Sequence, residues 1–170
     1  MDFVLGHILE AVLIGLGATA LIDLWALVLR RGFDIPSLSM CLLGRWLLHM
    51  PQGTFVHRSI AAASPKAHEC ACGWMAHYLI GITFALAFVL LAPGSWLQHP
   101  TPGPALVFGV VTTLVPLFVM QPSLGLGVAA SRTPHPNKAR VKSLATHTVF
   151  GAGLYLWALL LSHTWFGAGG

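Results

Sequence analysis

Residues 4–29 read VLGHILEAVLIGLGATALIDLWALVL, an apolar stretch whose only ionisable residues are His7, Glu10 and Asp23. A helix of roughly 20 apolar residues is needed to cross a hydrocarbon layer of about 30 Å. Three further stretches are long enough, at about residues 72–92, 104–128 and 144–163. Helix is expected because backbone amides that face lipid must be paired within their own segment. The sequence therefore predicts an all-α, polytopic membrane protein whose four transmembrane helices form a single domain over residues 1–170.

The composition favours the same class. Of the 170 residues, 56% are hydrophobic and 8% are charged, whereas a typical soluble domain carries roughly 25% charged residues. The formal net charge is +4, from nine basic and five acidic residues. This charge cannot form a continuous phosphate-binding stripe, which excludes a nucleic-acid partner. The expected partners are the lipid bilayer and either further copies of this small chain or a larger membrane complex.

Basic residues are confined to two of the connections between the apolar stretches. The first connection contains Arg30, Arg31, Arg45, Arg58 and Lys66, and the third contains Arg132, Lys138, Arg140 and Lys142. The connection over residues 93–103 has no Lys or Arg. The positive-inside rule therefore predicts that both basic connections face the cytoplasm and that both termini lie on the periplasmic, outer side.

Two local patterns refine this topology. Residues 37–50 are expected to form a short interfacial helix in the first cytoplasmic loop, with Ser37 as a possible N-cap and Pro51 at its end. In the third span, Pro116 and Pro122 should kink or shorten the helix, because each removes one hydrogen bond from it. Broken helices of this kind can line substrate sites in transporters, although a helix also ends this way without any such role.

Ionisable side chains within spans usually face the protein interior or a water-filled cavity. Asp23, His77 and His147 all fall in the cytoplasmic half of their spans, so they are expected to occupy one layer. Three interpretations stay open for this layer. In the first, the layer is a hydrogen-bonded cluster that sets the helix register. In the second, it is a pathway for protons, ions or a small solute. In the third, the two imidazoles hold haem b or a metal ion.

Two further sets of residues are weaker candidates. His7, Glu10 and His163 form an outer polar set, in which the His7-x-x-Glu10 spacing is one that supplies metal ligands in helical bundles. His68, Cys70 and Cys72 lie together in the first loop and could bind a soft metal. Their Cys-x-Cys spacing differs from that of zinc sites. Because a cytoplasmic loop meets a reducing compartment, no disulfide is expected, and the thiols of this loop, including that of Cys41, are instead expected to be free.

The chain also resembles a family of small bacterial inner-membrane proteins that is classed only as a domain of unknown function. The similar stretches are residues 17–25, 32–38, 44–46, 49–51, 73–78, 118–122 and 129–134. They include GFDIPSL at residues 32–38, GWMAHY at 73–78 and FVMQP at 118–122. The resemblance implies a multi-span protein of the bacterial inner (cytoplasmic) membrane. It implies no activity and no catalytic residues.

The chain contains no Walker loop, no dinucleotide-binding glycine pattern, no Gly-x-Ser-x-Gly and no His-Glu-x-x-His. The sequence thus gives no indication of an enzyme. Proton, ion or small-solute transport through the Asp23–His77–His147 layer is the favoured function. A haem- or metal-binding redox subunit and an accessory subunit of a larger membrane complex are the alternatives.

Overall fold

The structure, a computed structural model, describes residues 2–163. Its α-helices are α1 (Asp2–Phe33), α2 (Met40–His49), α3 (Glu69–Leu91), α4 (Pro102–Thr112), α5 (Gln121–Ser123) and α6 (Pro136–Leu161). Short 3-10 segments occur at Met50–Gln52, Ile60–Ala62 and Val128–Ala130, and a π-helical turn at Pro116–Met120. The described residues contain no strand, which confirms the predicted all-α fold class.

Over the described residues, four helices are long and apolar enough to cross a membrane. They are Leu5–Phe33, Glu69–Leu91, Pro102–Ser123 and Pro136–Leu161, with mean hydropathies of 2.2, 1.9, 2.0 and 1.5. The last of them begins eight residues before the predicted start at residue 144, because Pro136 occupies the first turn of the helix, a position that suits proline. The third ends five residues before the predicted end at residue 128, where Gly125 adopts a φ of +89°.

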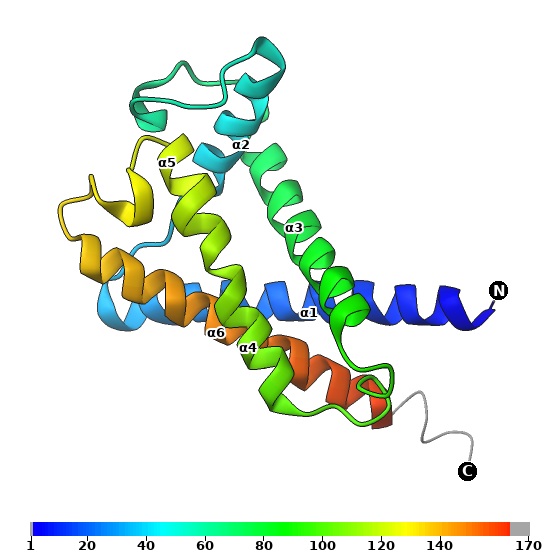
Figure 1. The fold of residues 1–170 in the computed structure, drawn as a ribbon. Helices are drawn as coiled ribbons and strands as arrows, with labels where there is room; N and C mark the ends of the chain where they lie inside the picture. Colours follow the sequence, from blue (N-terminus) through cyan, green and yellow to red (C-terminus); the bar gives the residue numbers. More distant parts are fainter. Residues whose placement is uncertain (1, 164–170) are drawn as a thin grey trace.

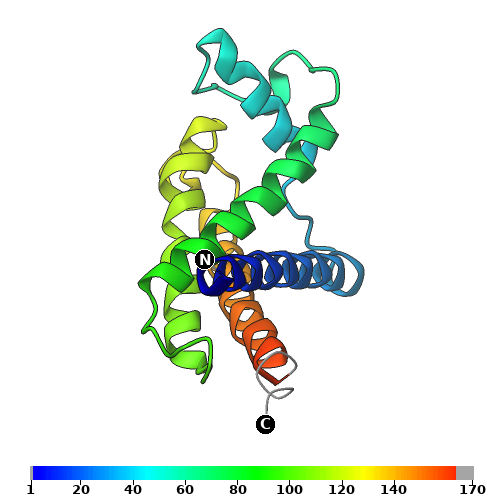
Figure 2. The ribbon, with the colours of Figure 1, turned by 90° about the vertical axis from the view of Figure 1, so that its right-hand side faces the viewer.

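The long helix α1 passes between α3 and α6 and contacts both of them, while α4 packs across α6 (Figures 1 and 2). Small residues make these crossings possible. On α1, a Cβ at Gly15 would lie 2.7 Å from the Cα of Ile82 on α3. A Cβ at Gly153 on α6 would likewise lie 2.7 Å from the Cα of Ala18. Close approach at small residues is the usual basis of helix association in membranes.

The third span is interrupted, as Pro116 and Pro122 predict. The regular helix α4 ends at Thr112, a π-helical turn follows from Pro116, and the three-residue α5 contains Pro122. Proline lacks a backbone N–H and collides with the preceding turn, so a helix that contains it changes its hydrogen-bonding pattern. The interruption turns the end of this span toward the loops at the upper left of Figure 1.

The helix predicted over residues 37–50 is α2. It begins at Met40 rather than after Ser37, and its N-cap is Ser39, whose side chain makes no capping hydrogen bond. It packs closely against the start of α3. A Cβ on Gly44 would overlap the carbonyl oxygen of Glu69, so the two backbones are in direct contact.

Covalent and ionic bonds reinforce this packing. Cys41 of α2 and Cys70 of α3 form a disulfide bond, and Cys72 is a free cysteine. The expectation of free thiols is therefore wrong for Cys41 and Cys70, because the α2–α3 crossing brings them together. The guanidinium of Arg45 donates from Nε and one terminal nitrogen to the two carboxylate oxygens of Glu69, at 2.8 and 2.7 Å.

The rest of the first loop folds back onto the end of the third span. The backbone N–H of His57 donates to the carbonyl of Ser123 at 2.8 Å, and that of Ile60 donates to the carbonyl of Leu124 at 3.1 Å. Gly125 is in contact with the backbone of this loop and leaves no room for a side chain. The loop thus links α2 to α5.

Candidate functional site

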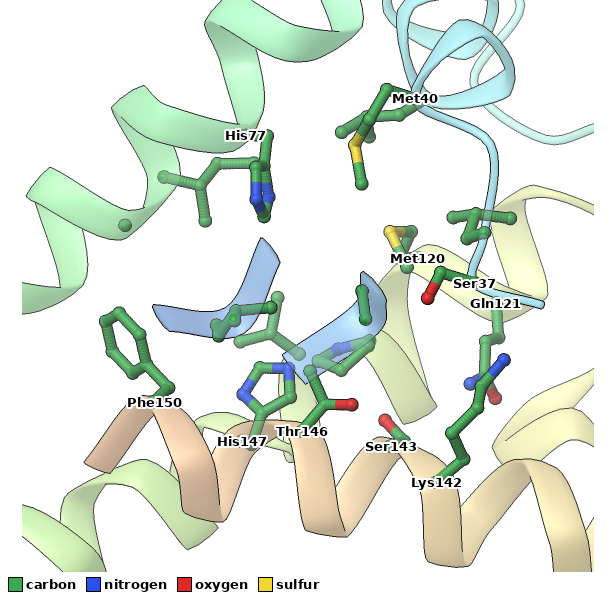
Figure 3. Close-up of a pocket in the computed structure, with 18 of the residues that line it drawn as sticks. Ser37, Met40, His77, Met120, Gln121, Lys142, Ser143, Thr146, His147 and Phe150 are labelled. Carbon is green, nitrogen blue, oxygen red and sulfur yellow. The ribbon is translucent and has the colours of Figure 1, made fainter. Parts of the chain in front are cut away.

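A cavity of about 430 Å³ lies where α1, α3, α6 and the interrupted third span meet (Figure 3). The segment that leads into α2 completes its wall. Most of the lining side chains are apolar, as in most small-molecule sites. The polar lining side chains used below are Asp23, Ser37, His77, Gln121, Lys142, Ser143 and His147.

One wall of the cavity contains a carboxylate with two hydrogen-bonding partners. Nε2 of His77 lies 3.0 Å from Oδ1 of Asp23, and the hydroxyl of Tyr78 donates to Oδ2 at 2.8 Å. The side chains of Asp23 and His77 are 26% and 17% exposed. Asp23 comes from α1, whereas His77 and Tyr78 are adjacent on α3. A carboxylate and an imidazole at this distance can share or exchange a proton.

His147 on α6 occupies the opposite wall. Its Nδ1 lies 2.8 Å from the hydroxyl oxygen of Thr112, and that hydroxyl donates to the carbonyl of Gly109 at 2.6 Å. Because the Thr112 hydrogen is directed to Gly109, the hydroxyl oxygen can only accept from His147. The network therefore assigns the proton of a neutral His147 to Nδ1 and leaves Nε2 as an acceptor.

The three residues predicted to share a layer are thus divided between two groups. Asp23 and His77 are bonded to each other, and His147 is bonded to Thr112. Within the described chain, no hydrogen bond or ion pair joins His147 to Asp23 or His77. All three line the same cavity, so they face a common space without forming one cluster.

A third polar region lies at the other end of the cavity. Lys142 Nζ donates to the backbone carbonyl of Pro36 at 2.7 Å. Gln121 is 8% exposed, and its buried Oε1 has no hydrogen-bond partner. In Figure 3 the amine of Lys142 and the carboxamide of Gln121 point toward one another, with Ser143 and Ser37 nearby in the same view. A buried carboxamide oxygen without a partner is costly unless a ligand or water supplies a donor.

The residues of the outer polar set, His7, Glu10 and His163, do not line this cavity. Glu10 is buried, with 4% exposure, and its Oε2 has no hydrogen-bond partner. His7 is partly buried, and His163 is exposed at the end of α6. In the first loop, Cys70 is bonded to Cys41 and so has no thiolate to offer beside His68 and Cys72. Among residues 2–163, no group of three or more His, Cys, Asp or Glu side chains is placed to hold a metal ion.

Four residues of the site were not among the predicted site residues: Gln121 and Lys142, which line the cavity, and Tyr78 and Thr112, which bond to the lining residues Asp23 and His147. Two of them had a signal in the sequence. Tyr78 is the direct neighbour of His77, and Gln121 lies between the two prolines of the interrupted span. Lys142 was counted among the basic loop residues, because the predicted fourth span began at residue 144. Thr112 had no distinguishing signal.

The fold and the cavity define a polytopic α-helical membrane protein with ionisable groups between its helices. Within that class, the chain belongs to the family described as "Protein of unknown function (DUF2938)", whose model matches residues 12–161. The family assignment confirms the resemblance seen in the sequence. No curated protein and no solved structure matches the chain.

Proposed function

We propose that this protein transports a small solute across the bacterial inner membrane and couples that movement to protons at the Asp23–His77 pair. One observation carries the proposal: a bonded carboxylate and imidazole line a cavity of about 430 Å³ between apolar helices. Intramembrane ionisable residues that face a cavity are typical of proton relays in pumps and transporters.

The chemistry of the pair supports proton coupling. The Asp23–His77 pair is negative when the imidazole is neutral and has no net charge after it gains one more proton. Loss of a proton from the pair changes the charge of the cavity wall. This changes the electrostatic interaction energy between the wall and a solute bound nearby. Gain and loss of a proton can therefore alter solute affinity between the two sides of the membrane.

The interrupted third span supports the solute pathway. Pro116 and Pro122 leave its end without a continuous helix, and Gln121 between them lines the cavity. Non-helical backbone at membrane depth is tolerated where it borders a cavity, and such segments form solute sites in transporters.

Proton movement can be measured with the purified protein in liposomes that contain a pH-sensitive dye, after a potassium gradient and valinomycin impose a membrane potential. We expect the wild-type protein to take up protons faster than protein-free liposomes. The Asp23→Asn variant should return the rate to that of protein-free liposomes, because an amide cannot exchange the proton. Asp34→Asn is the matched control, since Asp34 is exposed and lies outside the cavity.

A wild-type rate equal to that of protein-free liposomes would contradict the proposal and favour an accessory subunit. The absorption spectrum of the same preparation tests the haem alternative. A Soret band that disappears in His77→Ala or His147→Ala would replace transport with a redox function, because the imidazoles would then be axial ligands.

We further propose the orientation indicated by the basic residues, with both termini on the periplasmic side. The disulfide argues for the opposite orientation, since such bonds are typical of oxidising compartments. We give the basic residues priority because they determine the orientation of the helices while these insert into the membrane. The disulfide requires only that Cys41 and Cys70 be close together, and the α2–α3 crossing brings this about. A reporter enzyme active only in the periplasm, fused after Gly170, should be active; activity only of a cytoplasmic reporter would overturn the orientation.

A further inference from the structure

We propose that the cavity binds a medium-chain monocarboxylate, with its carboxyl group at Lys142 and Gln121 and its chain along the apolar walls. This inference rests on the proposed transport function and names the class of its solute. It starts from the polar end of the cavity, where a cation and a buried carboxamide occur together without an acidic partner.

Lys142 is the first element of this site. Its ammonium donates a hydrogen bond to the carbonyl of Pro36, a neutral group. The ion pairs Arg45–Glu69 and His77–Asp23 do not include Lys142. A partly buried ammonium without an acidic partner favours an anion beside it, because burial otherwise leaves its charge uncompensated.

Gln121 is the second and independent element. Its side chain is more than nine-tenths buried, and Oε1 has no hydrogen-bond partner. A carboxyl group satisfies a carboxamide in either protonation state. The acid O–H donates to Oε1, and after a half-turn of the amide its N–H₂ donates to the carboxylate. Such a residue suits a solute that exchanges a proton during transport.

The hydroxyls of Ser143 and Ser37 add donors at the same end. Both residues line the cavity, and neither hydroxyl takes part in a hydrogen bond within the described chain. Figure 3 shows Ser143 next to Lys142 along α6 and Ser37 on the segment before α2. A carboxylate placed between the amine and the carboxamide thus has several donors available.

The rest of the cavity selects the chain of the solute. Beyond the polar end, its walls include Leu38, Leu43, Ile80, Phe84, Val115 and Phe150. From Lys142 to Phe150 the cavity follows eight residues of α6, or about 12 Å along the helix axis. An extended octanoate chain has a similar length. His77 and Tyr78 each bond to one oxygen of Asp23, so the negative charge of this carboxylate is partly screened from the anion.

Binding can be measured by equilibrium dialysis of radiolabelled octanoate against the full chain in lipid nanodiscs, with empty nanodiscs subtracted. Octanol and octylamine serve as probes with the same chain and a different head group. We expect octanoate to bind at least about tenfold more tightly than either, since charge-assisted hydrogen bonds are the strong contacts available here. Equal binding of octanol, or tighter binding of octylamine, would overturn the carboxylate assignment.

Two variants test the assigned residues. Lys142→Met removes the charge, and Gln121→Glu keeps the shape of the side chain while adding a negative charge. Each should weaken octanoate binding about tenfold or more and leave octanol binding unchanged. Lys138→Met is the matched control, because Lys138 is exposed on the same helix and does not line the cavity. Unchanged octanoate binding in Gln121→Glu would contradict the proposal even if Lys142→Met failed to fold.

The dialysis experiment uses no gradient, so it is separate from the test of proton transport. Octanoate binding that persists in Asp23→Asn, in a protein that moves no protons, would retain the site and reject the coupled transport. Proton movement without selective octanoate binding would retain the transport function and reject the solute class.

Discussion

Thr112 and His147 form a hydrogen bond of 2.8 Å in which the imidazole is the donor, because the threonine hydroxyl already donates to the carbonyl of Gly109. The bond connects the third span to α6 next to the close contact of Gly109 with Gly151. It fixes the orientation of an imidazole that lines the cavity and leaves Nε2 as the unprotonated nitrogen.

Thr112→Val should destabilise the protein by about 1–3 kcal/mol. Valine has a similar shape but no acceptor, so the Nδ1–H of His147 would be left without a partner at a site that is 5% exposed. Thr148→Val is the control, because the hydroxyl of the half-buried Thr148 bonds only to the carbonyl of Leu144 in its own helix. Denaturant unfolding in detergent measures both, and equal losses of stability would contradict the assigned role of Thr112.

Gly73→Ala should separate α2 from α3 and lower the free energy of unfolding by about 1–3 kcal/mol. Any side chain at Gly73 would overlap the carbonyl of Met40, which is backbone and cannot move aside. Gly32→Ala is the matched control, since nothing lies within 4 Å of its Cβ position. A thermal midpoint for Gly73→Ala equal to that of Gly32→Ala would show that the helices are not in backbone contact.

Thiol labelling should find one reactive cysteine in the unfolded, unreduced protein and three after reduction. The expected site of the single label is Cys72, because Cys41 and Cys70 are bonded to each other. Mass spectrometry counts the labels. A bond that closes 29 residues of sequence stabilises the fold by roughly 3 kcal/mol, so reduction should also lower the thermal midpoint. Three labels without reduction would refute the disulfide.

The docking of the first loop onto the third span should weaken as the pH falls below about 6.5. Burial, and secondarily the neighbouring His49, lowers the pKa of His57 in the docked loop. The released loop therefore binds a proton more readily, and acid favours release. Hydrogen exchange at the amides of His57 and Ile60, corrected for the intrinsic rate, should show that their protection decreases as the pH is lowered.

In His57→Gln this loss of protection should disappear, because glutamine does not titrate. If the protection of Ile60 fell equally in the wild-type protein and in this variant, the pH dependence would have another origin.

The four membrane-spanning helices could be predicted because a lipid environment demands long apolar segments with internally paired backbone. Their ends could not, because local chemistry moves them. Pro136 starts α6 early, and Gly125 ends the third span early. The depth of Asp23 and His77 likewise followed from helix rise alone, and the structure joins them by a hydrogen bond.

The partners of His147 and the polar end of the cavity depend on how helices cross, which no single-helix pattern encodes. Thr112 meets His147 only because Gly109 and Gly151 let α4 and α6 touch. The disulfide had a signal in the sequence. Cys41 and Cys70 each precede a glycine by three residues, and these glycines, Gly44 and Gly73, make the α2–α3 contact.

The disulfide and the Arg45–Glu69 pair hold the α2–α3 side of the cavity together, whereas no such bond is described for the side formed by the interrupted third span. Met40, which lines the cavity, belongs to a helix fastened to α3 by a covalent link, an ion pair and interlocked backbones. The facing wall, around Met120, is a stretch of chain with an irregular hydrogen-bonding pattern. We therefore expect the proline-bearing segment, rather than the fastened helices, to be the wall that yields when a solute enters or leaves the cavity.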